Sequence, residues 1–217
     1  NNSSVNIKWI QTEKIKNFKD VRDVFSNVNG VLILPGFGSR GSEGKIKIVK
    51  YSREKEIPFL GICLGLQCAI IEFARNACKM KGANSTEFNA QTKYPVIDLM
   101  ESQRAIKIKG GTMRLGAYDC EIKVGTRTYA AYREKKISER HRHRYEVNIK
   151  YKSDFEKKGL IFSALSPDGS LPEIIELKGH PWFIGVQFHP EFKSRPFTPH
   201  PLFSSFIKAA GISGDIN

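Results

Sequence analysis

The run Gly-Ile-Cys-Leu-Gly at residues 61–65 constrains the fold of this 217-residue chain more than any other feature. It follows the apolar residues 58–60, which are typical of a short buried strand, and precedes a segment with the apolar spacing of a helix. A nucleophile flanked by small residues at a strand-to-helix turn indicates a nucleophile elbow, in which glycines permit the sharp turn. The sequence therefore predicts that Cys63 is a reactive thiol, and the free N–H groups of the helix N-terminus are expected to favour its thiolate.

Buried strands alternate with helical segments in the first part of the chain. Residues 31–34 and 58–62 are continuous apolar runs, as expected for parallel strands buried on both faces, and residues 43–55 have helical character. This order predicts an α/β fold with a mostly parallel central sheet flanked by helices and additional antiparallel strands, in one domain spanning residues 1–217. Further strands are predicted at residues 5–10, 105–109, 118–124, 140–148, 160–165, 173–177 and 182–188, and helices at residues 15–25, 154–158 and 202–210.

The composition limits the classes of partner. The net charge of +13 permits a nucleic-acid or phosphate-bearing partner, but Lys and Arg are spread along the chain and mixed with Glu, which favours a solvated surface and no nucleic acid. No stretch approaches the ~18 apolar residues of a membrane span, and no signal peptide is visible. The four cysteines form no CxxC pair, so we expect neither a disulfide framework nor a metal site and favour a reduced, cytoplasmic setting.

A cysteine nucleophile needs a base, and the base needs a group that orients it. The run Gln-Phe-His-Pro-Glu at residues 187–191 follows the last apolar strand. Residues two apart in extended chain point the same way, so His189 and Glu191 are predicted to lie side by side. A lone His beside a Pro is more often a surface residue, but the elbow upstream reverses that preference. The chain therefore offers a nucleophile, a base and an orienting carboxylate in the order Cys63, His189, Glu191.

An acyl-transfer site also needs backbone donors for an oxyanion. The N–H of Leu64 is one candidate, and Gly36, in the loop after residues 31–34, is the second. Residues 36–41 also match the dinucleotide-binding pattern G-x-G-x-x-G. That pattern requires an acidic residue at the end of the next strand, where this chain has Ile62 and Cys63. The dinucleotide interpretation is therefore rejected.

The elbow and the His-Pro-Glu run resemble those of class I glutamine amidotransferases. Over residues 5–210 the likeness narrows to the glutaminase domain of the CTP synthase family, and it rests on the runs at residues 40–45, 84–88, 110–116 and 139–147. The resemblance implies a flavodoxin-like sheet and hydrolysis of L-glutamine. In that reaction Cys63 attacks the side-chain amide, His189 protonates the departing ammonia and then activates water, and Glu191 orients His189.

The resemblance also implies which residues hold the substrate. Gln67, Glu87 and Arg144 are expected to bind glutamine, because Arg144 suits the α-carboxylate as a bidentate donor and Glu87 suits the α-ammonium. Phe37 and Arg40, together with a lid at residues 110–116, are the expected region for GTP, an allosteric activator in this family.

The expected partners lie outside this chain. The ammonia would pass to a synthetase domain that aminates UTP with ATP and Mg²⁺, and the family assembles as homotetramers mainly through that domain. No cofactor is expected in the glutaminase domain itself. The alternatives are another class I glutamine amidotransferase or a stand-alone γ-glutamyl hydrolase, a catalytically dead module, which would be expected to lack one of the three proposed catalytic residues, and a basic nucleic-acid-binding module.

Three departures from the family pattern are visible. Pro35 replaces a glycine in the loop that supplies Gly36, which removes a backbone donor and fixes φ. Leu66 replaces a methionine of similar volume. The chain begins at Asn1 without the strand and helix that open the family's domain, so we expect a truncated N-terminus and an absent synthetase domain.

Overall fold

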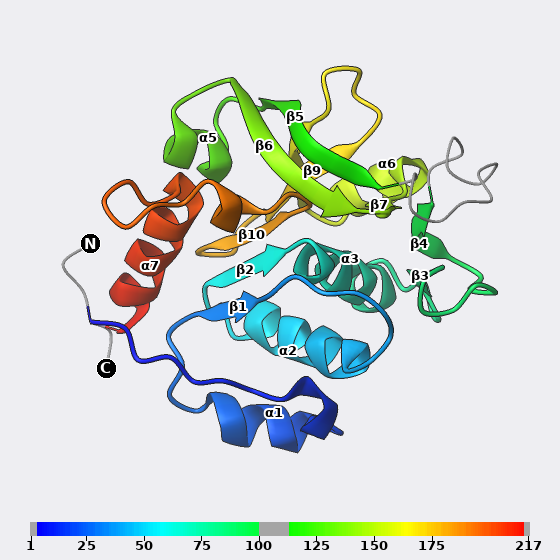
Figure 1. Cartoon of the computed structure of the whole chain (residues 1–217). Coiled ribbons are helices and arrows are strands. Elements are labelled where there is room, and N and C mark those ends of the chain that lie inside the picture. The colour runs from blue at the N-terminus through cyan, green and yellow to red at the C-terminus, as the bar shows by residue number, and fades with distance from the viewer. Residues whose placement is uncertain (1–3, 100–112, 215–217) are drawn as a thin grey trace.

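The computed structural model describes residues 4–99 and 113–214. A seven-stranded sheet has the order β1-β2-β10-β9-β8-β5-β6, and a three-stranded sheet has the order β3-β4-β7 (Figure 1). The strands are β1 (Val31–Ile33), β2 (Phe59–Ile62), β3 (Asn84–Ser85), β4 (Pro95–Leu99), β5 (Arg114–Ile122), β6 (Lys136–His143), β7 (Tyr145–Val147), β8 (Leu160–Leu165), β9 (Pro172–Leu177) and β10 (Phe183–Val186). The helices are η1 (Thr12–Lys14), α1 (Phe18–Phe25), α2 (Ser42–Glu54), α3 (Leu64–Asn76), α5 (Arg127–Tyr132), η3 (Ile149–Tyr151), α6 (Lys152–Glu156), η4 (Pro190–Phe192) and α7 (Pro201–Gly214).

Three neighbouring strands of the large sheet are parallel. β1 and β10 both pair with β2 in parallel, and Val186 lies opposite Ile62 at the carboxyl end. The pairings from β10 through β9, β8 and β5 to β6 are antiparallel. The expected α/β fold with additional antiparallel strands is confirmed, and the parallel part is the part that carries the elbow.

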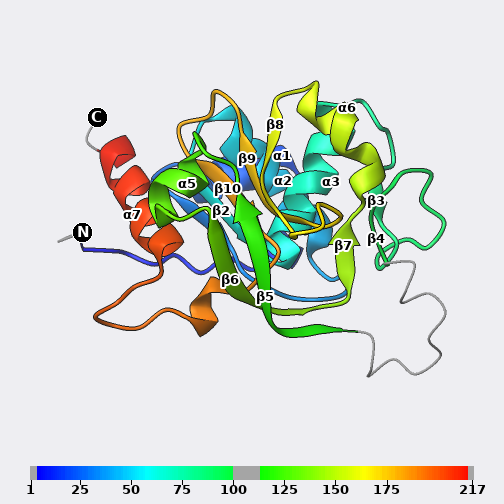
Figure 2. The ribbon, with the colours of Figure 1, turned by 90° about the horizontal axis from the view of Figure 1, so that it is seen from above.

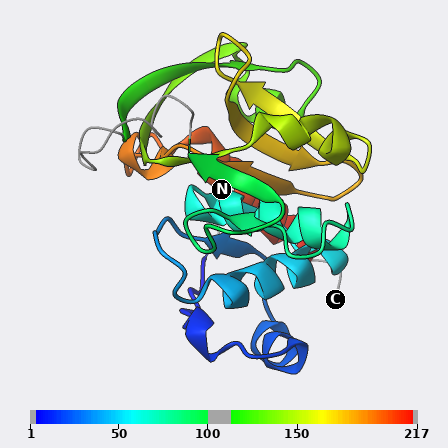
Figure 3. The same cartoon turned by 90° about the vertical axis from the view of Figure 1, so that its right-hand side faces the viewer.

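Helices cover both faces of the parallel strands. The apolar side chains of these strands alternate between the two faces, so each face forms a core with the helices packed against it. Phe59 and Phe183 stack at 4.4 Å on the face covered by α2 and α3. Leu60 and Ile184 point to the opposite face, in a second core that includes Phe206 of α7. In the side view of Figure 3 the N-terminal helices form the lowest layer, beneath the strands. The buried apolar runs predicted from the sequence are therefore strands covered on both faces.

The chain moves from the large sheet to the small one at a single residue. β6 ends at His143 and β7 begins at Tyr145, so Arg144 lies at the crossing. β7 then pairs with β4, with Tyr145 opposite Leu99. Seen from above, the small sheet lies at the end of the molecule away from α7 (Figure 2). The single strand predicted at residues 140–148 is therefore wrong, because the turn at Arg144 divides it between two sheets.

The strand predicted at residues 5–10 is also wrong. This segment has no regular structure, and Val5, Ile7 and Trp9 are 54%, 69% and 78% exposed. Alternating apolar residues form a strand only when the backbone of a neighbouring strand supplies the ladder of hydrogen bonds. No described residue forms such a ladder with this segment. The strand predicted at residues 105–109 lies outside the described residues. Within residues 4–99 and 113–214, no helix has the length and apolar character needed to cross a membrane.

Candidate active site

Cys63 occupies a strained turn between β2 and α3. Its backbone has φ 51° and ψ −101°, a conformation that non-glycine residues rarely adopt, and such strain is concentrated at functional sites. Glycines two residues before and after make the turn possible. A Cβ on Gly61 would lie 2.7 Å from the backbone carbon of Gly65, and a Cβ on Gly65 would lie 2.5 Å from the carbonyl oxygen of Ile33. The helix therefore lies directly against the two strands, and the predicted elbow geometry is confirmed.

The Cys63 side chain is a buried thiol. It is 4% exposed, and this burial raises its pKa to about 12. The N–H of Leu64 hydrogen-bonds to the sulfur and opposes the shift, whereas the carboxylates of Glu146, Glu191 and Glu87 add to it. The expectation that the helix N-terminus favours a resting thiolate is therefore wrong, because desolvation outweighs the single backbone donor.

His189 and Glu191 form a pair just beyond β10. The Nδ1 of His189 lies 2.6 Å from Oε1 of Glu191, which confirms that the two side chains are adjacent. A carboxylate only accepts, so Nδ1 donates its proton in this hydrogen bond. Nε2 is buried and has no hydrogen-bond partner within the described part of the chain. The imidazole also stacks on the Phe192 ring, with 5.1 Å between the ring centroids. The backbone N–H of His189 donates to the backbone carbonyl of Arg140. These contacts fix the orientation of the imidazole.

The parallel pairing of β2 and β10 brings the two halves of the site together. The N–H of Cys63 donates to the carbonyl of Val186 at 2.7 Å, so residues 187–191 continue from the same sheet edge as the elbow. Gln187 places its Nε2 at 3.7 Å from the Cys63 sulfur. Sequence reasoning missed this contact, although Gln187 belongs to the run that supplied His189. The feature of the sequence that could have identified Gln187 is its position, one residue after the end of β10, the strand that pairs with β2.

The two candidate oxyanion donors lie close together. A Cβ on Gly36 would lie 3.0 Å from Cδ2 of Leu64, so the loop after β1 packs on the first residue of α3. Beyond Pro35 the loop continues to Gly38, which adopts φ 73°. The N–H of Gly38 donates to the Glu87 carboxylate at 2.7 Å. This hydrogen bond connects the loop to the small sheet.

The proposed glutamine-binding residues come from three different elements. Gln67, on α3 and 3% exposed, donates through Nε2 to the carbonyl of Tyr145 at 3.1 Å and to Gln187 at 3.4 Å. Arg144 lies at the crossing between the two sheets. The charges of Glu87 and Arg144 both act on the pKa of the Tyr145 hydroxyl, in opposite directions. The structure thus gathers these residues around Tyr145.

The residues proposed for GTP lie on the surface. Phe37 is 90% exposed, and Arg40, whose side chain is 87% exposed, pairs with Glu13 at 2.7 Å. Of the lid predicted at residues 110–116, the first three lie outside the described residues and the last three begin β5. For the ranges that the structure describes, no group of three or more His, Cys, Asp or Glu side chains is arranged to hold a metal ion.

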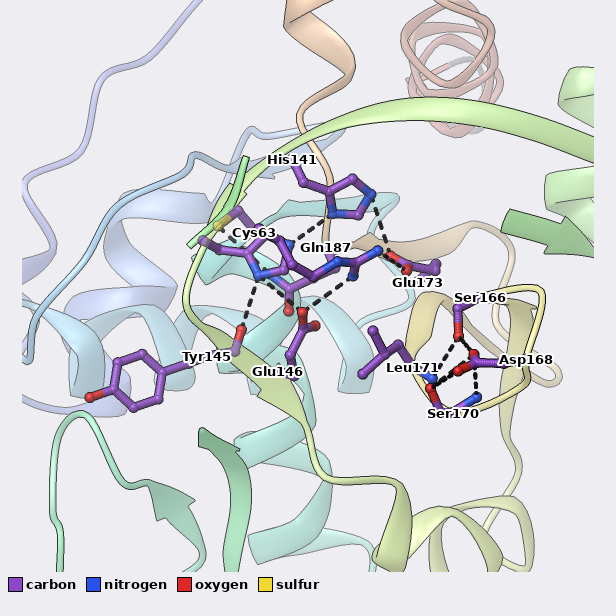
Figure 4. A network of polar contacts seen from close by, with 12 residues as sticks. Cys63, His141, Tyr145, Glu146, Ser166, Asp168, Ser170, Leu171, Glu173 and Gln187 are labelled. Carbon is purple, nitrogen blue, oxygen red and sulfur yellow. Dashed lines mark hydrogen bonds and ion pairs between the residues drawn. The ribbon is translucent and has the colours of Figure 1, made fainter. Parts of the chain in front are cut away.

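His141 and His143 are buried, and the sequence did not determine whether they face solvent or a ligand. They follow Ile137 and Glu139 on one face of β6, while the residues between them point outward. Apolar Ile137 at the start of this alternation is the signal that identifies the buried face. Figure 4 shows His141 in a polar network next to Cys63, and His143 joins this network through a 2.8 Å contact with His141.

Comparisons with known proteins identify the family of this chain. Residues 1–209 match the family model for class-I glutamine amidotransferases. The chain is 58% identical over 212 residues to a CTP synthase from Chloroherpeton thalassium and 56% identical over 207 residues to one from Caldanaerobacter subterraneus. These alignments cover 97% and 95% of this chain but 38% of each relative.

A solved structure is similar over nearly the whole chain. The glutaminase domain of Trypanosoma brucei CTPS with bound acivicin matches with a TM-score of 0.91 and 35% identity, covering 97% of this chain and 82% of that one. The two chains therefore share one fold over nearly the whole of this chain. The chain belongs to the class I glutamine amidotransferases, as a glutaminase domain of the CTP synthase type.

Proposed function

We propose that this chain hydrolyses L-glutamine to glutamate and ammonia, with Cys63 as the nucleophile, His189 as the acid–base group and Glu191 as its orienting partner. The observation that carries the proposal is the arrangement at the ends of β2 and β10. A strained, buried thiol lies at one strand end, and an imidazole with a free, buried Nε2 follows the other. Nucleophilic catalysis requires such a pair, with a third group fixing the base.

The reaction begins with proton transfer, since the thiol is neutral at rest. His189 Nε2 takes the thiol proton as the sulfur attacks the carboxamide carbon, and the N–H groups of Leu64 and Gly36 stabilise the oxyanion. His189 then returns the proton to the leaving nitrogen, the C–N bond breaks, and ammonia departs to leave a glutamyl thioester. Water, activated by the same imidazole, attacks the thioester carbon. The C–S bond breaks, which releases glutamate and restores the thiol.

Three side chains are proposed to hold the amino-acid end of glutamine. Arg144 binds the α-carboxylate, Glu87 binds the α-ammonium, and the amide of Gln67 supports both through the Tyr145 carbonyl. Binding of an ammonium group beside Glu87 also neutralises one of the carboxylates that raise the pKa of the Cys63 thiol. Substrate binding is therefore expected to make proton loss from Cys63 easier.

The wider role is proposed from the relatives, of which this chain spans 38%. Ammonia would pass to a synthetase domain that aminates UTP with ATP and Mg²⁺, GTP would activate through the region of Phe37 and Arg40, and the assembly would be a homotetramer. A cytoplasmic setting is proposed from the four free cysteines. The relatives reported above are CTP synthases, so a stand-alone γ-glutamyl hydrolase is not favoured.

The test is a pair of variants at the elbow. Cys63→Ala is expected to abolish glutamate release from glutamine while keeping the circular dichroism spectrum and unfolding temperature of the parent. Cys68→Ala, a buried cysteine on α3 that faces the core, is the matched control and should keep the parent rate. Glutamate release at the parent rate by Cys63→Ala would refute the mechanism. Acivicin, which is bound in the Trypanosoma brucei structure, is expected to protect the parent from a thiol reagent at Cys63.

A further inference from the structure

Five buried ionisable side chains form a closed ring next to the candidate site. Arg114 donates to Oε1 of Glu146 at 3.2 Å and to Oε1 of Glu173 at 2.8 Å. His143 lies 3.5 Å from Glu146 through Nδ1 and 2.8 Å from Nδ1 of His141 through Nε2. His141 closes the ring, with its Nε2 at 3.6 Å from Oε2 of Glu173 (Figure 4). Each of the five residues is at most 7% exposed.

Neutral imidazoles satisfy two of the ring's contacts but leave the contact between His141 and Glu173 without a proton. His143 Nδ1 lies 3.2 Å from the carbonyl of Tyr145, which only accepts, so this nitrogen carries a proton. Its Nε2 then accepts from Nδ1 of His141. The remaining His141 Nε2 is left with a lone pair facing the carboxylate oxygen of Glu173. Both of these buried atoms are without a hydrogen-bond partner in residues 4–99 and 113–214, as is Oε2 of Glu146. One added proton would satisfy both His141 Nε2 and Glu173 Oε2 once these atoms approach by a few tenths of an ångström from 3.6 Å.

The net charge of the ring also indicates that it holds one additional proton. One arginine against two glutamates leaves a net charge of −1 in the interior, which is costly without a further positive charge. Burial raises the pKa of Glu146 to about 8 and also raises that of Glu173, while it lowers the pKa of His141 to about 2 and of His143 to about 3. A bound proton at one carboxyl makes the ring neutral. At Glu173 that proton also gains an acceptor, the facing nitrogen of His141.

We propose that the ring holds one proton between Nε2 of His141 and Oε2 of Glu173, and that in this neutral form it positions the turn containing Arg144 beside Cys63. The inference rests on the proposed function in one respect, namely that Arg144 binds glutamine. The proton itself is a property of the folded chain and needs no substrate.

Two chains of hydrogen bonds connect the ring to Cys63. The Tyr145 carbonyl that accepts from His143 also accepts from Gln67, which in turn donates to Gln187. Separately, the backbone N–H of Gln187 donates to the carbonyl of Glu173 at 2.9 Å. Gln187 then donates to the sulfur of Cys63. Since the ring residues flank Arg144 in sequence, the same contacts fix the backbone on both sides of that arginine.

The surroundings of the ring favour retention of the proton. The Tyr118 ring packs on Arg114 at 4.5 Å and on His141 at 5.4 Å, so it covers both side chains on the β5 side. The negative charge of Asp168, in the loop after β8, raises the pKa of Glu173. The other titratable groups that act electrostatically on the ring or respond to its charge are the imidazole of His189 and the thiols of Cys63 and Cys120.

Two substitutions at Glu173 test whether the ring needs a hydrogen-bond donor at this position or a negative charge. In Glu173→Gln the amide N–H takes the place of the proton and the amide oxygen still accepts from Arg114, so the KM for glutamine is expected to stay within about threefold of the parent. Glu173→Leu removes one of the two carboxylate partners of Arg114 and leaves an apolar group facing Nε2 of His141. It should raise KM about tenfold, equivalent to about 1.4 kcal/mol, with a smaller change in kcat. The matched control is Arg142→Gln, which lies between the two histidines but on the exposed face of β6 and should keep the parent KM.

Equal impairment of Glu173→Gln and Glu173→Leu would overturn the proposal, because the ring would then need an ionised carboxylate. Since the leucine variant could fail to fold, the parent protein provides a second measurement without glutamine. Imidazole ¹⁵N spectra and infrared spectra near neutral pH should show either a protonated Nε2 on His141 or a carboxylic-acid band that Glu173→Gln removes. A neutral His141 without a proton on Nε2, together with an ionised Glu173, would refute it. Failure of the Cys63→Ala test would leave these spectra unchanged, so the two hypotheses fail separately.

Discussion

Gly61→Ala tests whether the contact between β2 and α3 is as close as the structure indicates. The added Cβ would lie 2.7 Å from the carbon, 2.8 Å from the oxygen and 2.9 Å from the next nitrogen of the helix backbone. Ordinary contacts begin near 3.4 Å, so the helix must move away from the strand by about 0.7 Å. Backbone atoms cannot rotate away as a side chain can. We therefore expect the upper part of the range for overpacking, about 2–3 kcal/mol of lost stability.

The same displacement should affect activity, because Cys63 lies between the strand and the helix that separate. A shift approaching 1 Å at a reacting group costs about 100-fold in rate, so kcat/KM for glutamine is expected to fall by about that factor. A loss of 2–3 kcal/mol lowers the unfolding temperature of a chain of this size by about 4–12 °C. Thermal unfolding followed by circular dichroism and a coupled glutamate assay measure the two effects. The control is Gly211→Ala in α7, where the added Cβ would have no described neighbour within 4 Å. Helix propensity predicts that this variant gains up to about 1 kcal/mol of stability. A Gly61→Ala variant with the parent stability and rate would show that the contact is looser than described.

Three further variants probe other parts of the molecule. Glu191→Gln is expected to lower kcat by at least about 100-fold with a small change in KM, because the imidazole loses the carboxylate that fixes its tautomer; an unchanged kcat would remove Glu191 from the mechanism. Burial raises the pKa of the Cys68 thiol to about 12, so this thiol is neutral in the folded chain. In the unfolded chain it ionises above pH ~9, so its contribution to the free energy of unfolding is complete below pH ~9 and is lost progressively toward pH ~12. Cys68→Ala should lessen that fall by about 1.4 kcal/mol per pH unit in urea titrations, and a parallel fall in both proteins would contradict the assignment. Glu176→Ala removes an acceptor from the start of α5, where it bonds two backbone N–H groups and the Thr128 hydroxyl, and should cost about 2–4 kcal/mol in chemical denaturation, against less than 1 kcal/mol for exposed Glu134→Ala.

Features encoded in a short stretch of sequence were predicted well. The elbow around Cys63 and the pair His189–Glu191 each depend on residues within a few positions, and the structure has both in the expected local geometry. The strand at residues 160–165 was likewise predicted with the observed bounds, β8 being Leu160–Leu165. In each case the apolar pattern and the turn residues lie within one element, so no distant partner is needed to interpret them.

Features that depend on distant partners were missed. Helix α5 was not predicted, because the acceptor for its first N–H groups is Glu176, almost fifty residues later. The ring around Arg114 depends on the β5–β6 register, which places Arg114 opposite His143, and on β9, which supplies Glu173. The turn at Arg144 is hidden in a run with continuous strand character, since only a second sheet requires the chain to turn there. Sequence patterns describe what a segment prefers, whereas these features depend on which other segments are already in place.

The position of β10 has a consequence for how the chain acquires its structure. β10 is the last strand in sequence, yet it lies between β2 and β9 in the middle of the large sheet. During synthesis, β2 is made more than a hundred residues earlier and has an unpaired edge until β10 arrives. Pairings of such high contact order form slowly, and an unpaired apolar edge is open to aggregation in the meantime. The thiol and the imidazole therefore meet only after β10 has paired with β2. A partly made chain that lacks β10 carries Cys63 without its base and is not expected to hydrolyse glutamine.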